Sequence, residues 1–300
     1  MRSGCLREQL EEACCGQSIT HSETLWRLPG SPPAFGLTAA GELRILRAGD
    51  AVDLGASQPR NGKELPMRVR IAQGRDDYLR AFRLVYRTYR KRGYMAPHPA
   101  EIRFGPHYAY RTTRTLIALD ERGTVVGTLS VVGDNRAGLP MEAIYEAEVH
   151  WLRKCNRRLA EATGFAIAAS RPSQGAVIFF ALSRFLVQYC YWCRYDDLLI
   201  TVHPVQVSFY EGVLGFELLG DCRPHPLVQG APSVALRLDL RTAHCRVGSY
   251  LSRRYFYPRI PARYFLVPPM SERERRYFSA LYYGSVNRAA TIYEPPQRAA

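Results

Sequence analysis

Apolar and polar positions alternate in several short runs between residues 67 and 240. Residues 67–72 alternate strictly, and residues 115–119 and 124–132 flank the turn Asp-Glu-Arg-Gly, which predicts a β-hairpin. Further strand-like runs cover residues 158–168, 196–204 and 233–240, and a short one begins at Phe216. These runs predict one mixed, centrally parallel sheet with strands near Val69, Leu116, Val126, Leu159, Leu199 and Leu236. We expect the strands around Glu161 and Ile200 to splay apart and form a cleft.

Segments in which apolar residues have helical spacing follow or separate most of these strand-like runs. Two aspartates open a helix near residue 76, whose apolar face is opposed by the arginines Arg80, Arg83, Arg87 and Arg90. Further helices are predicted after Pro140, after Gly175, over residues 205–214 and over residues 271–283. Strands mixed with helices in this order predict an α+β or α/β domain.

The pattern is weak at both ends of the chain. Residues 1–66 lack a sustained period and carry Gly, Pro and Asn turn signals, so we expect an N-terminal arm that is partly disordered. Residues 67–243 form the predicted domain. Residues 244–300 are basic and aromatic, and we interpret them as an extension packed on that domain.

Composition limits the classes of partner. The net charge is +14, and arginine carries nearly all of the positive charge, which has two explanations: GC-rich coding, or an acidic partner. There is no zinc-finger spacing or basic repeat, so nucleic acid is not expected. The sequence has no signal-peptide core and no apolar run judged long enough to span a bilayer, and contact with a membrane surface has no clear support. We therefore expect a cytoplasmic protein whose eight cysteines are reduced.

Residues 158–219 carry the candidate chemistry. A strand is followed by the polar loop 168–175, a long apolar helix, a second strand and a short helix that contains Tyr210 and ends at Gly215. A polar loop that leads into a helix N-terminus presents free backbone N–H groups, so the loop is a candidate anion-binding site.

Four segments carry a family resemblance: RLVYRTYRKRGY, HYAYRTTRTLIAL, the run from TVVGTLSVVGDN to RRLAEATGFAI, and LLITVHPVQVSFYEGVLGFELLG. Together they resemble the FeeM-like long-chain N-acyl amino acid synthases, which have the GNAT-like acyltransferase fold. The resemblance covers residues 67–240 and implies a GNAT-like mixed sheet flanked by helices. It also implies an N-acyltransferase that moves a long acyl chain from an acyl carrier protein thioester to the amine of an amino acid.

The resemblance implies roles for the loop and for the strand before it. Backbone groups of Phe165, Ala166 and Ile167 would contact the donor, and an N–H group there would stabilise the oxyanion. Arg171, Gln174, Gly175 and Ala176 would hold its phosphopantetheine. Gln174 stands where the GNAT pattern has its first glycine, so acyl-CoA and an acyl carrier protein both remain candidate donors, and no tightly bound cofactor is expected.

Acyl transfer to an amine requires a base, an oxyanion donor and an acid for the leaving thiolate. Glu161 is the candidate base, because it is a lone carboxylate in an apolar strand; a structural ion pair is the alternative. Tyr210 resembles the family's general acid, although it is alternatively a core tyrosine. The candidate substrate-binding residues are Arg83, Phe179, Phe180 and His203. Lactone synthases carry an arginine where this chain has Gly164, which speaks against lactone synthesis.

Other features have simpler explanations. Cys190 and Cys193 have CxxC spacing, but they lie on an apolar helical stripe, so buried thiols are expected and no metal site is predicted. The arginine stripe from Arg80 to Arg90, together with Arg171, is either a solvated helix face or a docking surface for an acidic carrier protein. Two alternative functions stay open: a conventional acetyl-CoA- or acyl-CoA-dependent GNAT N-acetyltransferase, and a non-catalytic GNAT-like binding module.

Overall fold

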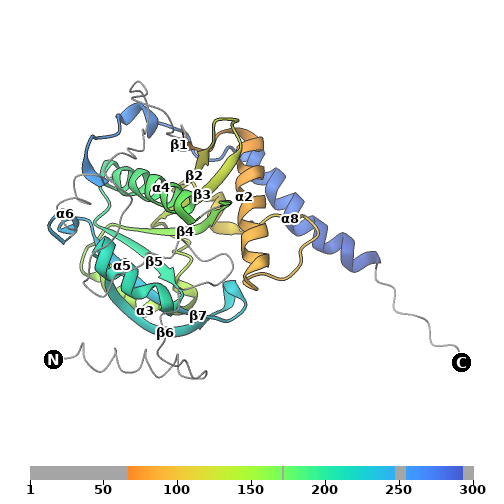
Figure 1. The fold of residues 1–300 in the computed structure, drawn as a ribbon. Helices are drawn as coiled ribbons and strands as arrows, with labels where there is room; N and C mark the ends of the chain where they lie inside the picture. The colour runs from red at the N-terminus through yellow and green to blue at the C-terminus, as the bar shows by residue number, and fades with distance from the viewer. Residues whose placement is uncertain (1–66, 171, 247–254, 293–300) are drawn as a thin grey trace, which may run out of the picture.

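A computed structural model describes residues 67–170, 172–246 and 255–292. The predicted N-terminal arm, residues 1–66, lies outside these ranges. The described residues form one mixed sheet with helices on both faces (Figure 1). The strands are β1 Arg68–Ile71, β2 Thr113–Leu119, β3 Val125–Gly133, β4 Leu159–Ile167, β5 Asp197–Val202, β6 Glu217–His225 and β7 Ala231–Asp239.

The sheet has the order β1-β2-β3-β4-β5-β7-β6. Strands β4 and β5 pair in parallel, and the other neighbours pair antiparallel. The predicted hairpin is β2–β3, and all six predicted strands are present. The prediction of a centrally parallel mixed sheet is therefore confirmed.

Two helices cover each face of the sheet. Helices α2 (Gly74–Lys91) and α3 (Glu142–Lys154) pack on one face, and α4 (Pro172–Trp192) and α5 (Val207–Leu214) pack on the other. The described residues also contain the helices α6 Ala243–Arg246 and α8 Glu272–Ile292, with the 3-10 turns η1 Pro106–Ala109, η2 Pro204–Gln206, η3 Pro226–Val228 and η4 Ala262–Tyr264.

Alternation along the strands explains these two layers. Leu116 and Ala118 of β2 pack into the core beneath α4, whereas Ile117 and Leu119 pack with α2. Side chains of successive residues in a strand point to opposite faces, so a strand buried on both sides supplies two cores. Both cores are needed to hold the central strands β3, β4 and β5.

Helix α4 corrects one expectation from the sequence. By length and apolar composition it is long enough to cross a membrane, contrary to the expectation that no such run exists. Most of the helix is buried inside the fold, where residues such as Ile178, Leu182 and Phe185 pack on the sheet. Its apolar character is that of a core helix.

The C-terminal residues contact both layers. Helix α8 lies beside α2 (Figure 1), where the ring centroid of Phe278 is 5.2 Å from that of Phe82. The segment that starts at Tyr255 crosses α4. There Gln188 donates to the Tyr255 carbonyl at 2.8 Å and accepts from the Ile260 N–H at 2.7 Å.

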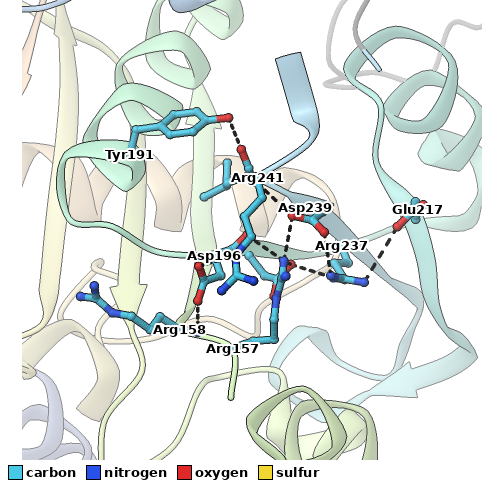
Figure 2. A network of polar contacts seen from close by, with 10 residues as sticks. Arg157, Arg158, Tyr191, Asp196, Glu217, Arg237, Asp239 and Arg241 are labelled. Carbon is cyan, nitrogen blue, oxygen red and sulfur yellow. Dashed lines mark hydrogen bonds and ion pairs between the residues drawn. The ribbon is translucent and has the colours of Figure 1, made fainter. Parts of the chain in front are cut away.

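An ion-pair clamp joins one end of the central strands; we define it as Arg157, Asp197, Arg237 and Asp239 (Figure 2). Asp197 is fully buried at the start of β5. Arg157, just before β4, donates to both of its oxygens at 2.6 and 2.7 Å. Arg237 of β7 donates to Asp197 at 2.7 Å. The clamp therefore fixes β4, β5 and β7 to one another where β4 and β5 begin.

Candidate functional site

The strands β4 and β5 separate at the end opposite the clamp. Their parallel register runs from Leu159 opposite Asp197 to Ala162 opposite Ile200, and stops there. Strand β4 continues to Ile167 along β3, and β5 continues to Val202 along β7. The predicted splay is confirmed, and a pocket of about 190 Å³ lies at it.

The pocket has two chemically different sides. Polar and charged side chains come from the end of α2, the loop after it and the β6–β7 turn: Tyr89, Arg92, Tyr94, Arg103, His107 and His225. Apolar and aromatic side chains come from α4, α5, the strands and the C-terminal segment: Phe179, Leu186, Leu198, Tyr210, Leu238, Tyr255 and Phe256. The lining thus changes from polar to apolar from one side of the pocket to the other.

Glu161 lines this pocket from β4 and is only 2% exposed. Its Oε2 accepts a hydrogen bond from the backbone N–H of Met141 at 2.8 Å, at the N-terminal end of α3. Burial raises the pKa of Glu161 to about 8, although the Met141 N–H partly offsets that effect. Among the described residues, no arginine or lysine forms an ion pair with Glu161. The alternative role for Glu161, a structural ion pair, is therefore absent from the described structure.

The charge of Glu142, the residue after Met141, is balanced by Arg153. Arg153 donates to Glu142 at 2.6 and 2.8 Å and to Asp134 at 2.7 and 2.8 Å. The charge of Glu142 adds to the raised pKa of Glu161, but it is the smallest of the three causes. The proton affinity of Glu161 is therefore set mainly by its burial.

A β-bulge follows Glu161 in the same strand. Thr163 lies opposite Ser130 and Ala166 lies opposite Thr128, so Gly164 and Phe165 share one partner position. Gly164 has a φ of +64°, and a Cβ there would lie 2.5 Å from the hydroxyl of Tyr108. This position needs glycine for both reasons, which explains why no arginine stands there.

Tyr210 lies on α5, on the other face of the sheet from Glu161. Its ring packs against Phe179, Phe209 and Phe216, with centroids 6.3, 5.3 and 5.5 Å away. Burial raises the pKa of Tyr210 and the charge of Arg92 lowers it, so its hydroxyl is protonated at neutral pH. Tyr210 lines the pocket and can donate a proton into it.

The edge of β4 beyond Ala162 has no partner strand on the β5 side. The N–H of Ala168 donates to Val126 of the neighbouring segment at 2.9 Å. Because backbone groups alternate sides along a strand, the N–H of Ile167 points to the open edge. Of the three residues predicted to contact the donor, Phe165 lines the pocket, whereas Ala166 and Ile167 do not; Ala166 is buried.

The loop before α4 lies next to the pocket along the chain, but none of residues 168–170 and 172–176 lines it. The side chain of Gln174 accepts a hydrogen bond from the Ser170 N–H at 3.1 Å. Gly175 and Ala176 are buried in the first turn of α4. Arg171 lies outside the described residues.

The predicted substrate-binding residues are only partly brought together. Phe179 and His203 line the pocket, whereas Phe180 is absent from the lining and packs on Tyr255 with centroids 6.0 Å apart. His203 also accepts a weak hydrogen bond from the Val205 N–H at 3.4 Å, at the start of η2. Arg83 is exposed on the outer face of α2 and does not line the pocket.

The polar side of the pocket was not predicted from the sequence. Arg92, Arg103 and His107 come from the end of α2 and the loop after it, whereas His225 comes from β6, far away in the chain. The signal available in the sequence was the aromatic and histidine content of residues 94–113, which includes His107. Burial lowers the pKa of His107 to about 4, with a further contribution from the charge of Arg103, so this histidine is neutral.

The described residues contain no cluster of three or more side chains suited to a metal ion. Cys190 is buried and Cys193 is half-buried, and both are free thiols. Burial raises the pKa of each, so neither is a reactive thiolate at neutral pH.

Comparisons with known proteins agree with this geometry. The family described as "N-acyl amino acid synthase FeeM" matches residues 80–239, which is more than half of the chain. A search of curated protein sequences found no match. The solved structure of FeeM, an N-acyl amino acid synthase from uncultured soil microbes, is similar with a TM-score of 0.54 and 25% identity, over 61% of this chain and 95% of that one.

A second solved structure, that of the AHL synthase LasI, has a TM-score of 0.49 and 15% identity, over 67% of this chain and 98% of that one. The family match covers strands β2 to β7, which include the splay and the strand that carries Glu161. The chain therefore belongs to the FeeM family of N-acyl amino acid synthases, and it is an N-acyltransferase with a GNAT-like fold.

Proposed function

We propose that this N-acyltransferase moves a long acyl chain from an acyl carrier protein thioester to the α-amine of an amino acid. The observation that carries the proposal is the apolar part of the pocket. Its lining reaches Leu198 and Leu238, each one residue from the ion-pair clamp, and includes Ala243 and Phe256 beyond the sheet. An acetyl group needs no such apolar length, whereas a long chain gains free energy with every buried methylene.

The reaction needs three groups at the splay. The neutral amine attacks the thioester carbonyl carbon, and the carboxylate of Glu161 takes the proton that the new C–N bond releases. The open-edge N–H of Ile167 is the candidate donor to the oxyanion. When the C–S bond breaks, Tyr210 protonates the thiolate, and the proton held by Glu161 returns to Tyr210 through solvent.

The loop before α4 favours a carrier protein over CoA as donor. Gln174 already accepts from the Ser170 N–H, so that backbone donor is occupied. A CoA pyrophosphate is bound by free N–H groups at such a loop. A carrier-bound phosphopantetheine has a single phosphate and no adenosine pyrophosphate, so it needs fewer of these donors.

A donor panel tests the proposal. Purified protein is incubated with acetyl, octanoyl, dodecanoyl and hexadecanoyl groups, each on an acyl carrier protein and on CoA, with a mixture of amino acids. The N-acylated products are identified by mass spectrometry. We expect a preference for long chains on the carrier protein; a preference for acetyl-CoA would contradict the proposal and favour the conventional acetyltransferase.

The substitution Gln174→Gly tests the argument about the loop. It frees the Ser170 N–H and restores the glycine of the GNAT pattern, so we expect the ratio of kcat/KM for acyl-CoA to that for acyl carrier protein to rise several-fold. The control is Gln73→Ala, at an exposed position before α2. Gln73 does not line the pocket, whereas Gln206 does. An unchanged ratio in Gln174→Gly would show that the loop does not select the donor.

A further inference from the structure

Arg92 is the C-cap residue of α2 and lines the polar side of the pocket. Its side chain is half-buried, and its Nε is buried with no hydrogen-bond partner. Among the described residues, no carboxylate forms an ion pair or a hydrogen bond with its guanidinium. A charged group removed from water without a partner costs free energy that a bound anion would offset.

The surroundings of Arg92 contain phenols rather than acids. Burial lowers its pKa, and the groups that raise it again are Tyr94, Tyr89 and Tyr210. An anion on this guanidinium would therefore displace no protein carboxylate. Arg157, which is also half-buried, differs because it has two aspartates as partners.

Arg103, the second arginine of the pocket, is already engaged. It donates to the Leu227 carbonyl at 2.9 Å, and its guanidinium lies 4.8 Å from the ring centroid of Tyr89. Arg92 is thus the cation of the pocket lining whose guanidinium has no described protein acceptor.

Arg92 lies in a different place from the loop before α4, which is the candidate site for the donor's phosphate. The candidate phosphate loop, as far as it is described, contributes no residue to the pocket lining, whereas Arg92 lines the same pocket as Glu161 and Tyr210. Its charge acts on the Tyr210 hydroxyl, so it lies within electrostatic range of the proposed acid. An anion at Arg92 therefore belongs to a molecule whose reacting group sits at the splay.

We propose that Arg92 binds the α-carboxylate of the acceptor and so selects free amino acids over neutral amines. The inference rests on the proposed function. In an α-amino acid the amine and the carboxylate share one carbon atom, so a carboxylate fixed by a bidentate guanidinium also fixes the nucleophilic nitrogen.

The first test compares an amino acid with its own methyl ester as acceptor, using the amino acid that the donor panel shows to react fastest. In the unmodified protein we expect a lower KM for the acid. Arg92→Gln should raise the KM for the acid by about 10- to 100-fold and leave the KM for the ester within about 2-fold. Arg92→Lys should recover part of the loss, because the charge remains. Arg122→Gln, at an exposed position in the turn between β2 and β3 and outside the pocket lining, is the control and should change neither value.

The second test needs no turnover. Isothermal titration measures the binding of N-dodecanoyl-alanine and of its methyl ester to the unmodified protein and to Arg92→Gln. We expect the acid to bind more tightly than the ester, and the substitution to remove that difference. Equal binding of acid and ester to the unmodified protein, no binding of either, or an equal loss for both in Arg92→Gln would overturn the inference. If no acyl transfer is detected but the acid still binds through Arg92, the proposed reaction fails and the carboxylate site stands.

Discussion

Glu161 combines burial with a single hydrogen bond from the Met141 N–H at the start of α3. A helix N-terminus favours the ionised carboxylate, and burial favours the protonated form. Burial dominates, so the pKa lies at about 8 and the group exchanges its proton near neutral pH. A residue in this range takes a proton from an ammonium or amine more readily than a solvated glutamate does.

Glu161→Gln should lower kcat by about 10²- to 10⁴-fold, because the amide keeps the shape but cannot accept the proton. In the unmodified protein, kcat/KM should rise with pH and level off above an apparent pKa near 8. That limb should be absent from the residual rate of the variant. Steady-state kinetics between pH 6 and pH 10 measure both effects, and a variant within about 3-fold of the unmodified rate would exclude Glu161 as the base.

The same substitution should change stability in a pH-dependent way. The folded pKa of about 8 lies above the reference value of 4.5, so the folded state holds a proton that the unfolded state has lost. Stability therefore falls as pH rises from about 4.5 to about 8, and the Glu161→Gln variant is free of that loss. Thermal unfolding at pH 5 and pH 8.5 should show the variant gaining on the unmodified protein at the higher pH. Glu146→Gln, an exposed change on α3, should show no such gain.

At the scale of elements, β4 and β5 are fixed at one end and open at the other. The ion-pair clamp holds the first residues of the parallel pair, whose register extends over only four residue pairs. The opening is thus a local property of the sheet, because strong pairing at the clamp keeps the splay from spreading. Figure 2 shows Arg157, from before β4, and Arg237, from β7, both beside Asp239 at the end of β7.

Asp197→Ala should lower the free energy of unfolding by about 3–5 kcal/mol, since it leaves Arg157 and Arg237 without their shared partner. Denaturant unfolding measures the loss. Asp221→Ala, which removes an exposed aspartate from β6, should stay within about 0.5 kcal/mol of the unmodified protein. A similarly small loss for Asp197→Ala would mean that the clamp does not hold the strands.

Sequence reasoning reached the strands but not the polar side of the pocket. Alternation is a local signal, so β2, β3, β4, β5 and β7 were predictable from neighbouring residues. The pocket lining combines Arg92 with His225 of β6, and only the tertiary fold brings these two segments together. On α2, Arg83 and Arg92 differ by half a helical turn, so only Arg92 shares the direction of the buried Val85. The family resemblance indicated Arg83 of this helix, whereas the structure places Arg92 in the pocket lining.

At the scale of the molecule, the positive charge is not equally available to a partner. Arg80 forms an ion pair with Asp76 at 2.7 Å and donates to the Gly123 carbonyl at 3.0 Å, and Arg90 donates to the Met95 carbonyl at 2.8 Å. Arg83 and Arg87 are exposed and have no described acid partner. The predicted docking stripe on α2 is therefore reduced to these two arginines.

Arg87→Glu should weaken the binding of an acidic acyl carrier protein several-fold at low salt, and the difference should shrink as salt screens the charges. Arg194→Glu makes the same change of charge between α4 and β5, beside the clamp, and is the matched control. Surface plasmon resonance at low and high salt measures both. Equal binding by Arg87→Glu and the control at low salt would mean that α2 presents only a solvated face.

The wall of the pocket contributed by Tyr255 and Phe256 lies outside residues 80–239, the part matched by the family. These residues reach the pocket because the segment crosses α4, where the Tyr255 hydroxyl is 2.7 Å from that of Ser183. Glu161 and Tyr210 thus lie inside the matched part of the chain, whereas Tyr255 and Phe256 of the pocket wall lie outside it. Under the proposed function, substitutions at Phe256 would change the size of the apolar end and leave β4 unchanged, so a lineage could alter its preferred chain length and keep the strand that carries Glu161.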